Sequence, residues 1–437
     1  MIFLRPLFVF ALLCAAWPAE AQRLSALAPP PDWSQLEAFQ ESMTHDDFVR
    51  LLDRVYAPAG AAKGVIDVEA DAAVVKMTLT PPSEMRLRFA KDAAAVKAAP
   101  RYWRTPAQLG AAPDGQPLAG LKISLDPGHL GGAWAKMEER YFQIGESRPV
   151  TEGDMALRVA KMIVPKLQAL GAQVSLVRAS AEPVTKERPE TLRDAARAEL
   201  ALEGVTSPRE NYDGMNDPGR GSTVQAQSEL LFYRISEIRQ RAALVNAQLQ
   251  PDLVVCLHFN AEGWGDPARP EFVPHNHLHV IVNGCYSAGE LHFDDQRLEM
   301  LEKLLSNAFP EELAASESVA NSLAAATKLP PYSYTTGNAV RAADNPYIWA
   351  RNLLANRLYH APVVFLEPYV MNSEVIWERV QAGDYEGEQM IGGELRPSLF
   401  REYADAVVAG LRDYYAKART PQPAAAPPPA NSPPIPK

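Results

Sequence analysis

Cysteine is scarce in this chain of 437 residues, which contains only three. Cys14 lies in an apolar run near the N-terminus, and Cys256 and Cys285 lie in or beside apolar, strand-like segments. Two cysteines outside the N-terminal run cannot form the disulfide framework that holds small secreted scaffolds together. We therefore expect a fold stabilised by its hydrophobic core. A disulfide between Cys256 and Cys285 is possible in an oxidising compartment, but their apolar surroundings favour buried free thiols.

An excess of positive charge is also missing. The chain has 43 Lys and Arg against 53 Asp and Glu, which gives a formal net charge of −10. Nucleic acids and anionic membrane surfaces are bound mainly through clustered Lys and Arg. Neither is therefore an expected partner.

Long apolar runs are absent after the N-terminus. Arg5 is followed by a short apolar segment, residues 7–16, and then by Ala19–Glu20–Ala21, a small-x-small cleavage site. The apolar segment is too short to span a bilayer, although an uncleaved membrane anchor is the alternative. We predict a signal peptide over residues 1–21 and a secreted mature protein, periplasmic or extracellular, without a membrane span.

The composition divides the rest of the chain. Residues 32–106 show a helical period and then three strand-like runs, which predicts a small α+β unit. Residues 106–117 read as a linker, and a second domain, with the pattern of strands and helices described below, extends over 119–417. The Pro-rich segment 418–437 is expected to be a disordered tail.

From Leu121 onward, strands alternate with helices. The expected strands are 122–125, 173–177, 252–257, 278–282 and 362–366, and the expected helices are 151–170, 235–249, 296–309, 347–358 and 398–416. Such alternation predicts an α/β fold with a mostly parallel sheet flanked by helices. Pro165 is expected to kink or break the end of the first helix.

Metal-binding residue types follow three of these strands. Asp126 and His129 follow the first, His258 follows the strand 252–257, and Glu367 follows the last. Ligands of parallel α/β sheets gather outside the carboxyl ends of the strands. If the three strands are parallel, two histidines and a carboxylate converge on one crevice, and such residues suit Zn²⁺.

A second histidine cluster, His275, His277 and His279, approaches the strand 278–282. Alternate residues of a strand share a face, so a second metal site is one interpretation. An ordinary strand edge is the favoured alternative because no Cys or carboxylate completes the set.

Four motifs in this order resemble those of the zinc-dependent N-acetylmuramoyl-L-alanine amidases of the Amidase_3 type, which are cell-wall hydrolases. They are Asp126–Pro127–Gly128–His129 before Leu130–Gly131–Gly132, Glu152 before Leu157 and Ala160, Arg241 before Val245–Asn246, Asp252 and His258–Phe259–Asn260–Ala261, and Glu367 before Tyr369 and Asn372–Ser373–Glu374. The resemblance covers roughly residues 121–415. Leu130 departs from it where the family has glycine, and Val245 where the family has alanine.

The resemblance implies the chemistry of the site and the residues that perform it. The reaction is hydrolysis of the amide between N-acetylmuramic acid and L-alanine, with one Zn²⁺ per chain. The implied ligands are His129, Glu152 and His258, the implied general base is Glu367, and Asp126, Arg241 and Asn260 are expected to orient ligands or contact substrate.

The expected partners follow from this resemblance. They are peptidoglycan as substrate and, where activity is restrained, a regulatory protein, with the enzyme itself a monomer. Residues 179–233, a long connection without a clear strand, form an insertion that we expect beside the crevice, limiting access to it. Two alternatives stay open: a zinc peptidase or carboxypeptidase that cuts stem peptides, and a non-catalytic wall-binding protein.

Overall fold

The computed structural model describes residues 23–419, apart from 215 and 264–270. Its centre is a seven-stranded sheet in the order β10-β11-β9-β12-β8-β4-β7. The pairs β11–β9, β12–β8, β8–β4 and β4–β7 are parallel, whereas β9–β12 and β10–β11 are antiparallel. The predicted α/β fold with a mostly parallel sheet is confirmed. The strands are β4 (Lys122–Pro127), β7 (Gln173–Leu176), β8 (Leu253–Leu257), β9 (Leu278–Val282), β10 (Val340–Arg341), β11 (Ile348–Ala350) and β12 (Val363–Pro368).

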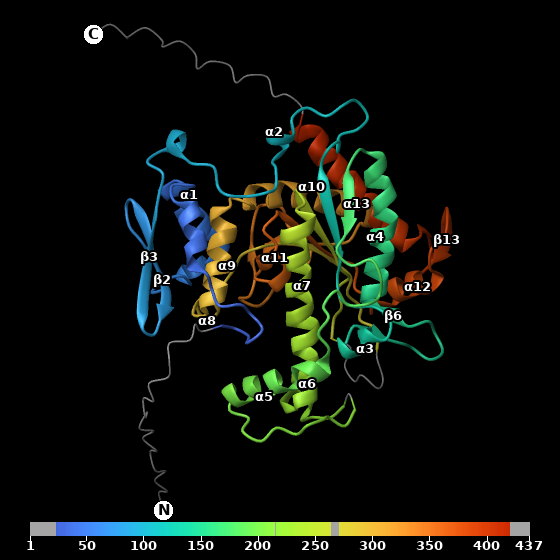
Figure 1. Cartoon of the computed structure of the whole chain (residues 1–437). Helices are drawn as coiled ribbons and strands as arrows, with labels where there is room; N and C mark the ends of the chain where they lie inside the picture. The colour runs from blue at the N-terminus through green and yellow to red at the C-terminus, as the bar shows by residue number, and fades with distance from the viewer. Residues whose placement is uncertain (1–22, 215, 264–270, 420–437) are drawn as a thin grey trace, which may run out of the picture.

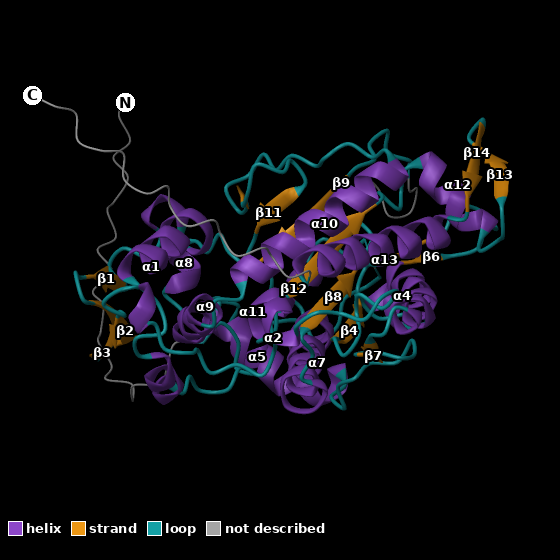
Figure 2. Cartoon of the chain, turned by 90° about the horizontal axis from the view of Figure 1, so that it is seen from above, coloured by secondary structure: helices purple, strands orange, loops and turns teal. Residues whose placement is uncertain are grey.

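Helices cover both faces of the sheet (Figure 2). One face carries α4 (Glu152–Ala169), α10 (Phe309–Thr327) and α13 (Leu399–Ala418), and the other carries α7 (Glu237–Leu244) and α11 (Leu354–Leu358). All five residues of β8 are buried, as expected for an apolar strand covered on both sides. Shorter elements around this core are α2 (Pro106–Leu109), α3 (Trp134–Met137), β5 (Tyr141–Phe142), β6 (Val150–Thr151), α8 (Ala288–Leu291), α9 (Asp294–Leu305), α12 (Glu374–Ala382), β13 (Glu388–Ile391) and β14 (Glu394–Pro397).

Helix α4 passes through its proline. Of the predicted kink or break at Pro165, the break does not occur, because the helix continues to Ala169. Pro165 is exposed, whereas Ile163 and Leu167 on either side are fully buried. Burial of these two side chains stabilises the last turns against the loss of one backbone hydrogen bond.

The segment 347–358 is not one helix, which corrects the sequence-based expectation. It contains strand β11, which pairs with β9, and then the short helix α11. Ile348, Trp349 and Ala350 are all buried in the sheet. A run this short gives no periodicity that separates a buried strand from a buried helix.

The N-terminal unit packs directly on the α/β domain. It contains α1 (His45–Leu51) and a three-stranded antiparallel sheet of β1 (Ile66–Val68), β2 (Ala72–Leu79) and β3 (Pro82–Arg88). Its buried residues belong to the same hydrophobic cluster as those of β4 and β8. The backbone amides of Cys285 and Tyr286 donate to the carbonyls of Val55 and Tyr56. The two parts therefore share one core.

Cys256 and Cys285 are both free and buried, as predicted. Burial raises the pKa of the Cys256 thiol well above its ordinary value, which makes it a poor nucleophile. Among the residues that the structure describes, no helix combines the length and apolar character needed to cross a membrane. The predicted signal peptide, and nearly all of the predicted tail, lie outside the described residues.

Candidate metal centre and active site

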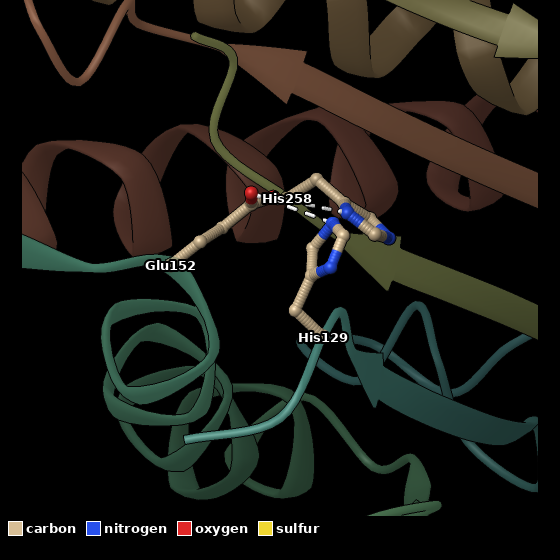
Figure 3. Close-up of side chains that lie close together, drawn as sticks. All are labelled: His129, Glu152 and His258. Carbon is tan, nitrogen blue, oxygen red and sulfur yellow. Dashed lines mark hydrogen bonds and ion pairs between the residues drawn. The ribbon is translucent and has the colours of Figure 1, made fainter. Parts of the chain in front are cut away.

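Strands β12, β8 and β4 are neighbours in the sheet and run parallel. The residues that follow them therefore meet at one edge, as the sequence predicted. His129 follows β4, His258 follows β8, and Glu152 opens helix α4 beside them (Figure 3). The ligand atoms of these three side chains all lie within 4.8 Å of one another, so together they can hold a metal ion.

Glu152 is the buried centre of this group, with 2% of its surface exposed. Its Oε1 lies 3.1 Å from Nδ1 of His258 and accepts a hydrogen bond from the backbone amide of Phe259, also at 3.1 Å. Its Oε2 lies 3.4 Å from Nε2 of His129. Burial alone raises the pKa of Glu152, but the two imidazoles and Arg140 hold it below its ordinary value. The carboxylate therefore stays ionised among the histidines.

Glu138, which was not among the predicted site residues, fixes the orientation of His129. Its Oε2 lies 3.2 Å from Nδ1 of His129 and accepts a hydrogen bond of 2.8 Å from the amide of Leu130. Nε2 of His129 is thereby left facing Glu152. Metal-bound histidines usually donate their second ring nitrogen to such a carboxylate or carbonyl. Burial lowers the pKa of His129 well below its ordinary value, which favours the neutral imidazole that binds metals.

The loop that carries His129 has a constrained backbone. His129 has a φ of 55°, in the left-handed region that side chains other than glycine rarely adopt. Arg241 holds this conformation, since its guanidinium donates to the carbonyls of Pro127 (2.8 Å) and His129 (3.0 Å). The left-handed conformation of His129 is therefore stabilised by hydrogen bonds from the buried Arg241 and not by the intrinsic conformational preference of histidine.

Asp126 acts on this loop through Arg241. Its carboxylate accepts hydrogen bonds from Arg241 at 2.9 Å and from the Tyr359 hydroxyl at 2.5 Å. Its hydrogen-bond partners are thus a guanidinium and a phenol, not a ligand imidazole, and the contact expected from Asp126 is made by Glu138 instead. Glu237 also pairs with Arg241, at 2.7 Å, so two carboxylates surround this buried guanidinium.

Gly128 allows the two histidines to approach each other. A Cβ built on Gly128 would lie 2.1 Å from Cε1 of His258 and 2.4 Å from both ring nitrogens. His258 cannot turn away easily, because its ring stacks on Phe365 with centroids 4.4 Å apart. A side chain at residue 128 is therefore incompatible with the position of His258.

We predict that Gly128→Ala lowers the affinity for metal by about tenfold or more while the fold is retained, because the methyl group displaces one ligand. Metal affinity measured by calorimetry, with circular dichroism as the check on folding, tests this. Gly221→Ala is the control: Gly221 is exposed, does not line the cavity, and a Cβ there meets no other atom within 4 Å. Equal metal affinity for the Gly128→Ala variant and the wild-type protein would contradict the role of Gly128.

Glu367 is not one of the three residues grouped to hold a metal, but it lines a cavity together with His129 and His258. The cavity has a volume of about 400 Å³, and Asp126, Gly128, His129 and His258 also contribute to its wall. Burial raises the pKa of Glu367 to about 7. A carboxylate with a raised pKa at the wall of such a cavity is suited to accept and return a proton near neutral pH.

Two other sequence-based expectations concern residues beside the site. The Asn260 side chain accepts a hydrogen bond of 2.7 Å from the amide of Ala261, so it stabilises a turn and is not part of the cavity wall. His277 and His279 are buried, and Nε2 of His277 lies 3.0 Å from Glu262. In the described part of the chain, His129, Glu152 and His258 form the one group of three or more residues placed to hold a metal.

The insertion 179–233 lies beside the site, at the lower edge of the molecule in Figure 1. It contains α5 (Arg193–Leu202) and α6 (Val224–Leu230), and α6 continues through a π-helical turn into α7. Leu130, which departs from the motif given above, is fully buried in the hydrophobic cluster of the insertion. Arg220 of the insertion pairs with Glu139, next to Glu138. Leu130 and the Arg220–Glu139 pair therefore anchor the insertion to the His129 loop.

Three residues of the site were not identified from sequence: Glu138, Arg140 and Arg351. Arg140 lies 3.3 Å from Glu152 and donates to His129 at 3.4 Å, and Arg351 lines the cavity with Glu367. The available signal was weak. Glu138 and Arg140 fall in a charged run after β4, and Arg351 lies in the segment expected to be helical.

No family model matches the chain, and a search of curated proteins found no match either. Solved structures do show a likeness. The N-acetylmuramyl-L-alanine amidase Ami1 from Mycobacterium smegmatis is 15% identical, with 69% of this chain and 99% of that chain covered and a TM-score of 0.36. The CwlD amidase from Clostridioides difficile, in complex with the GerS lipoprotein, is 12% identical (68% and 98% covered, TM-score 0.37). The amidase AmiC2 of Nostoc punctiforme is 15% identical (68% and 97% covered, TM-score 0.32).

Proposed function

We propose that this protein is a zinc-dependent N-acetylmuramoyl-L-alanine amidase. The observation that carries the proposal is the meeting of His129, Glu152 and His258 beside a cavity whose wall also contains Glu367. These are the four residues that the sequence motifs assign to the chemistry. A binding protein on this fold would have no need of all four, so the arrangement favours catalysis over the wall-binding alternative.

The donor set fits zinc. Two imidazole nitrogens and one carboxylate oxygen are common ligands of catalytic Zn²⁺, which leaves a coordination position open. The contact of Glu138 with His129 supplies the second-sphere partner that such a histidine needs. When bound, Zn²⁺ would polarise the scissile carbonyl and lower the pKa of water at the site to about 7.

The residues of the chain then divide the remaining work. Glu367 takes the proton of the attacking water and returns it to the departing nitrogen of L-alanine. Arg241 keeps the His129 loop in its left-handed conformation, and Asp126 keeps Arg241 in place. The attack on the amide therefore needs no Ser or Cys nucleophile, in agreement with the inert environment of Cys256.

A defined substrate separates this proposal from the peptidase alternative. N-acetylmuramoyl-L-alanyl-D-glutamyl peptides contain both the lactyl amide and ordinary peptide bonds. An amidase releases a free lactyl carboxylate and a peptide with a free L-alanine amine, whereas a peptidase leaves L-alanine on the sugar. Mass spectrometry of the products distinguishes the two, and products of peptide-bond cleavage alone would overturn the proposal.

The proposed setting is the cell wall outside the cytoplasm. The predicted signal peptide, residues 1–21, supports export, and an acidic chain has no bulk attraction to an anionic wall, so recognition must come from the shape and charges of the site. We take the enzyme to act as a monomer, with a regulatory protein as partner where activity is restrained. N-terminal sequencing of the exported protein tests the cleavage after Ala21, and a first residue other than Gln22 would contradict it.

We further propose that the insertion limits access to the cavity. Tyr233 at its end lines the cavity, and Arg220 and Leu130 connect it to the His129 loop. Replacing residues 193–222 by a short linker removes Ala196 and Leu200 from the cluster that packs on Leu130. Together with Leu130→Gly, which loosens the remaining contact with the insertion, this replacement should increase cleavage of small muropeptides severalfold. Leu130→Gly alone is the control. Unchanged activity in the shortened protein would show that the insertion does not restrict the site.

A further inference from the structure

The charged groups around the cavity are unevenly paired. Each of its carboxylates except Glu367 has a cationic or imidazole partner within 4 Å: Asp126 and Glu237 with Arg241, Glu138 with His129, and Glu139 with Arg220. Arg140, which also lines the cavity, pairs with Glu152. Arg351 is different. Within the described residues it has no carboxylate within 4 Å, although it lines the cavity with Glu367.

Arg351 is held in position without being neutralised. It directly follows β11, and its amide donates to the carbonyl of Val282. Its guanidinium lies over the ring of Tyr334, 5.6 Å from the centroid, and Nη1 donates to the Tyr334 hydroxyl at 3.4 Å. A neutral phenol orients the guanidinium but does not compensate its charge.

Tyr334 is itself fixed. Its hydroxyl lies 3.1 Å from Nε2 of the buried His279, and its ring packs against Trp349 with centroids 5.1 Å apart. His279 is the cross-strand partner of Glu367 in the β9–β12 pair. The support of Arg351 is therefore built on the strand next to the one that carries the proposed base.

The lining of the cavity includes one more arginine of this kind. Arg234, an exposed residue of the helical turn Leu231–Ser236, lines the cavity and also lacks a carboxylate within 4 Å among the described residues. The apolar side chains of Ile238, Leu353 and Leu354 also line the cavity. An oriented guanidinium beside an apolar surface binds carboxylates more strongly than one in open solvent, because water screens the charge less.

We propose that Arg351 binds a carboxylate of the substrate, namely the free α-carboxylate of the glutamyl residue that follows L-alanine in the stem peptide. This inference rests on the proposed amidase function and names the peptide class that the site prefers. Stem peptides occur with this carboxylate free or converted to a carboxamide. Both forms have the same scissile bond and nearly the same shape, but only the free form carries the negative charge that pairs with a guanidinium.

Two muropeptides that differ only in this group, carboxylate against carboxamide, test the proposal. The wild-type enzyme should cleave the carboxylate form with a kcat/KM about 10- to 100-fold higher, mainly through KM. Arg351→Gln should abolish this preference by losing activity on the carboxylate form alone. Arg341→Gln is the matched control, since Arg341 lies over Trp349 in the same sheet but does not line the cavity. It should keep the wild-type preference.

A binding measurement separates failure of this inference from failure of the amidase proposal. The peptide product L-alanyl-γ-D-glutamyl-L-lysine and its α-carboxamide form are titrated calorimetrically into metal-free wild-type, Arg351→Gln and Arg341→Gln proteins. We expect the carboxylate peptide to bind about 10-fold or more tightly than the carboxamide in all but Arg351→Gln. Equal binding of the two peptides by the wild-type protein, or an unchanged preference in Arg351→Gln, would overturn the inference whatever the outcome of the turnover assays.

Discussion

Replacing Glu367 by Gln is expected to reduce turnover by roughly 10²–10⁴-fold without loss of zinc, because a removed general base typically costs that much. Gln keeps the size and hydrogen-bonding capacity of the side chain but cannot accept a proton. Glu367 lies in the cavity wall outside the group of three that can hold a metal, so the metal content should stay near the wild-type level. Single-turnover kinetics together with metal analysis of the purified variant measures both quantities.

Two results would contradict this role of Glu367. Parallel loss of zinc and activity would make it a fourth ligand, and a closed four-ligand site would be structural. Near-normal turnover would exclude it as the base and direct attention to another carboxylate. Glu374→Gln is a suitable control, because Glu374 begins α12 and lies outside this cavity. It should retain full activity.

His129→Ala and His258→Ala are expected to lose most of the bound metal, from about one ion per chain, and to lose turnover with it. An open site with three protein ligands cannot spare one. His129→Ala should also lower the thermal stability more than His258→Ala does, because it leaves Glu138 buried without its imidazole partner. Metal analysis after gel filtration and thermal unfolding curves of each variant measure the two effects.

His275→Ala is the matched control for these variants. His275 is exposed and belongs to the second histidine group, which lies outside the candidate metal centre. It should keep both metal and activity. Full metal occupancy in His129→Ala and His258→Ala would rule out the assigned ligands, and metal loss in His275→Ala would indicate a site elsewhere.

Much of this site was predictable because its residues follow strands of a parallel sheet. His129, His258 and Glu367 were placed at one edge on strand order and apolar runs alone, and β4, β8 and β12 are indeed adjacent. Strand ends are informative because a parallel sheet gathers them in one place. Glu152 needed more than this rule: it was recognised only through its spacing to Leu157 and Ala160 in the family motif.

The remaining features depend on long-range packing that local patterns do not encode. Glu138 could not be assigned, because nothing in a charged run indicates which carboxylate turns inward to an imidazole. Arg351 could not be assigned because the segment around it was predicted to be a helix. The buried strand β11, which precedes Arg351, is too short to show a hydrophobic period. The role of Leu130 could not be predicted, because it depends on the insertion that packs on it. Each of these residues is positioned by contacts between segments far apart in the chain.

We propose that this protein hydrolyses the amide between N-acetylmuramic acid and L-alanine through a metal held by His129, Glu152 and His258. Digestion of purified peptidoglycan by the intact protein, with and without a chelator, followed by mass spectrometry of the fragments, tests this most directly. We expect glycan strands with free lactyl carboxylates and stem peptides with free L-alanine amines, their release abolished by the chelator and restored by added Zn²⁺. Fragments in which L-alanine stays on the sugar, or full release in the presence of the chelator, would contradict the claim.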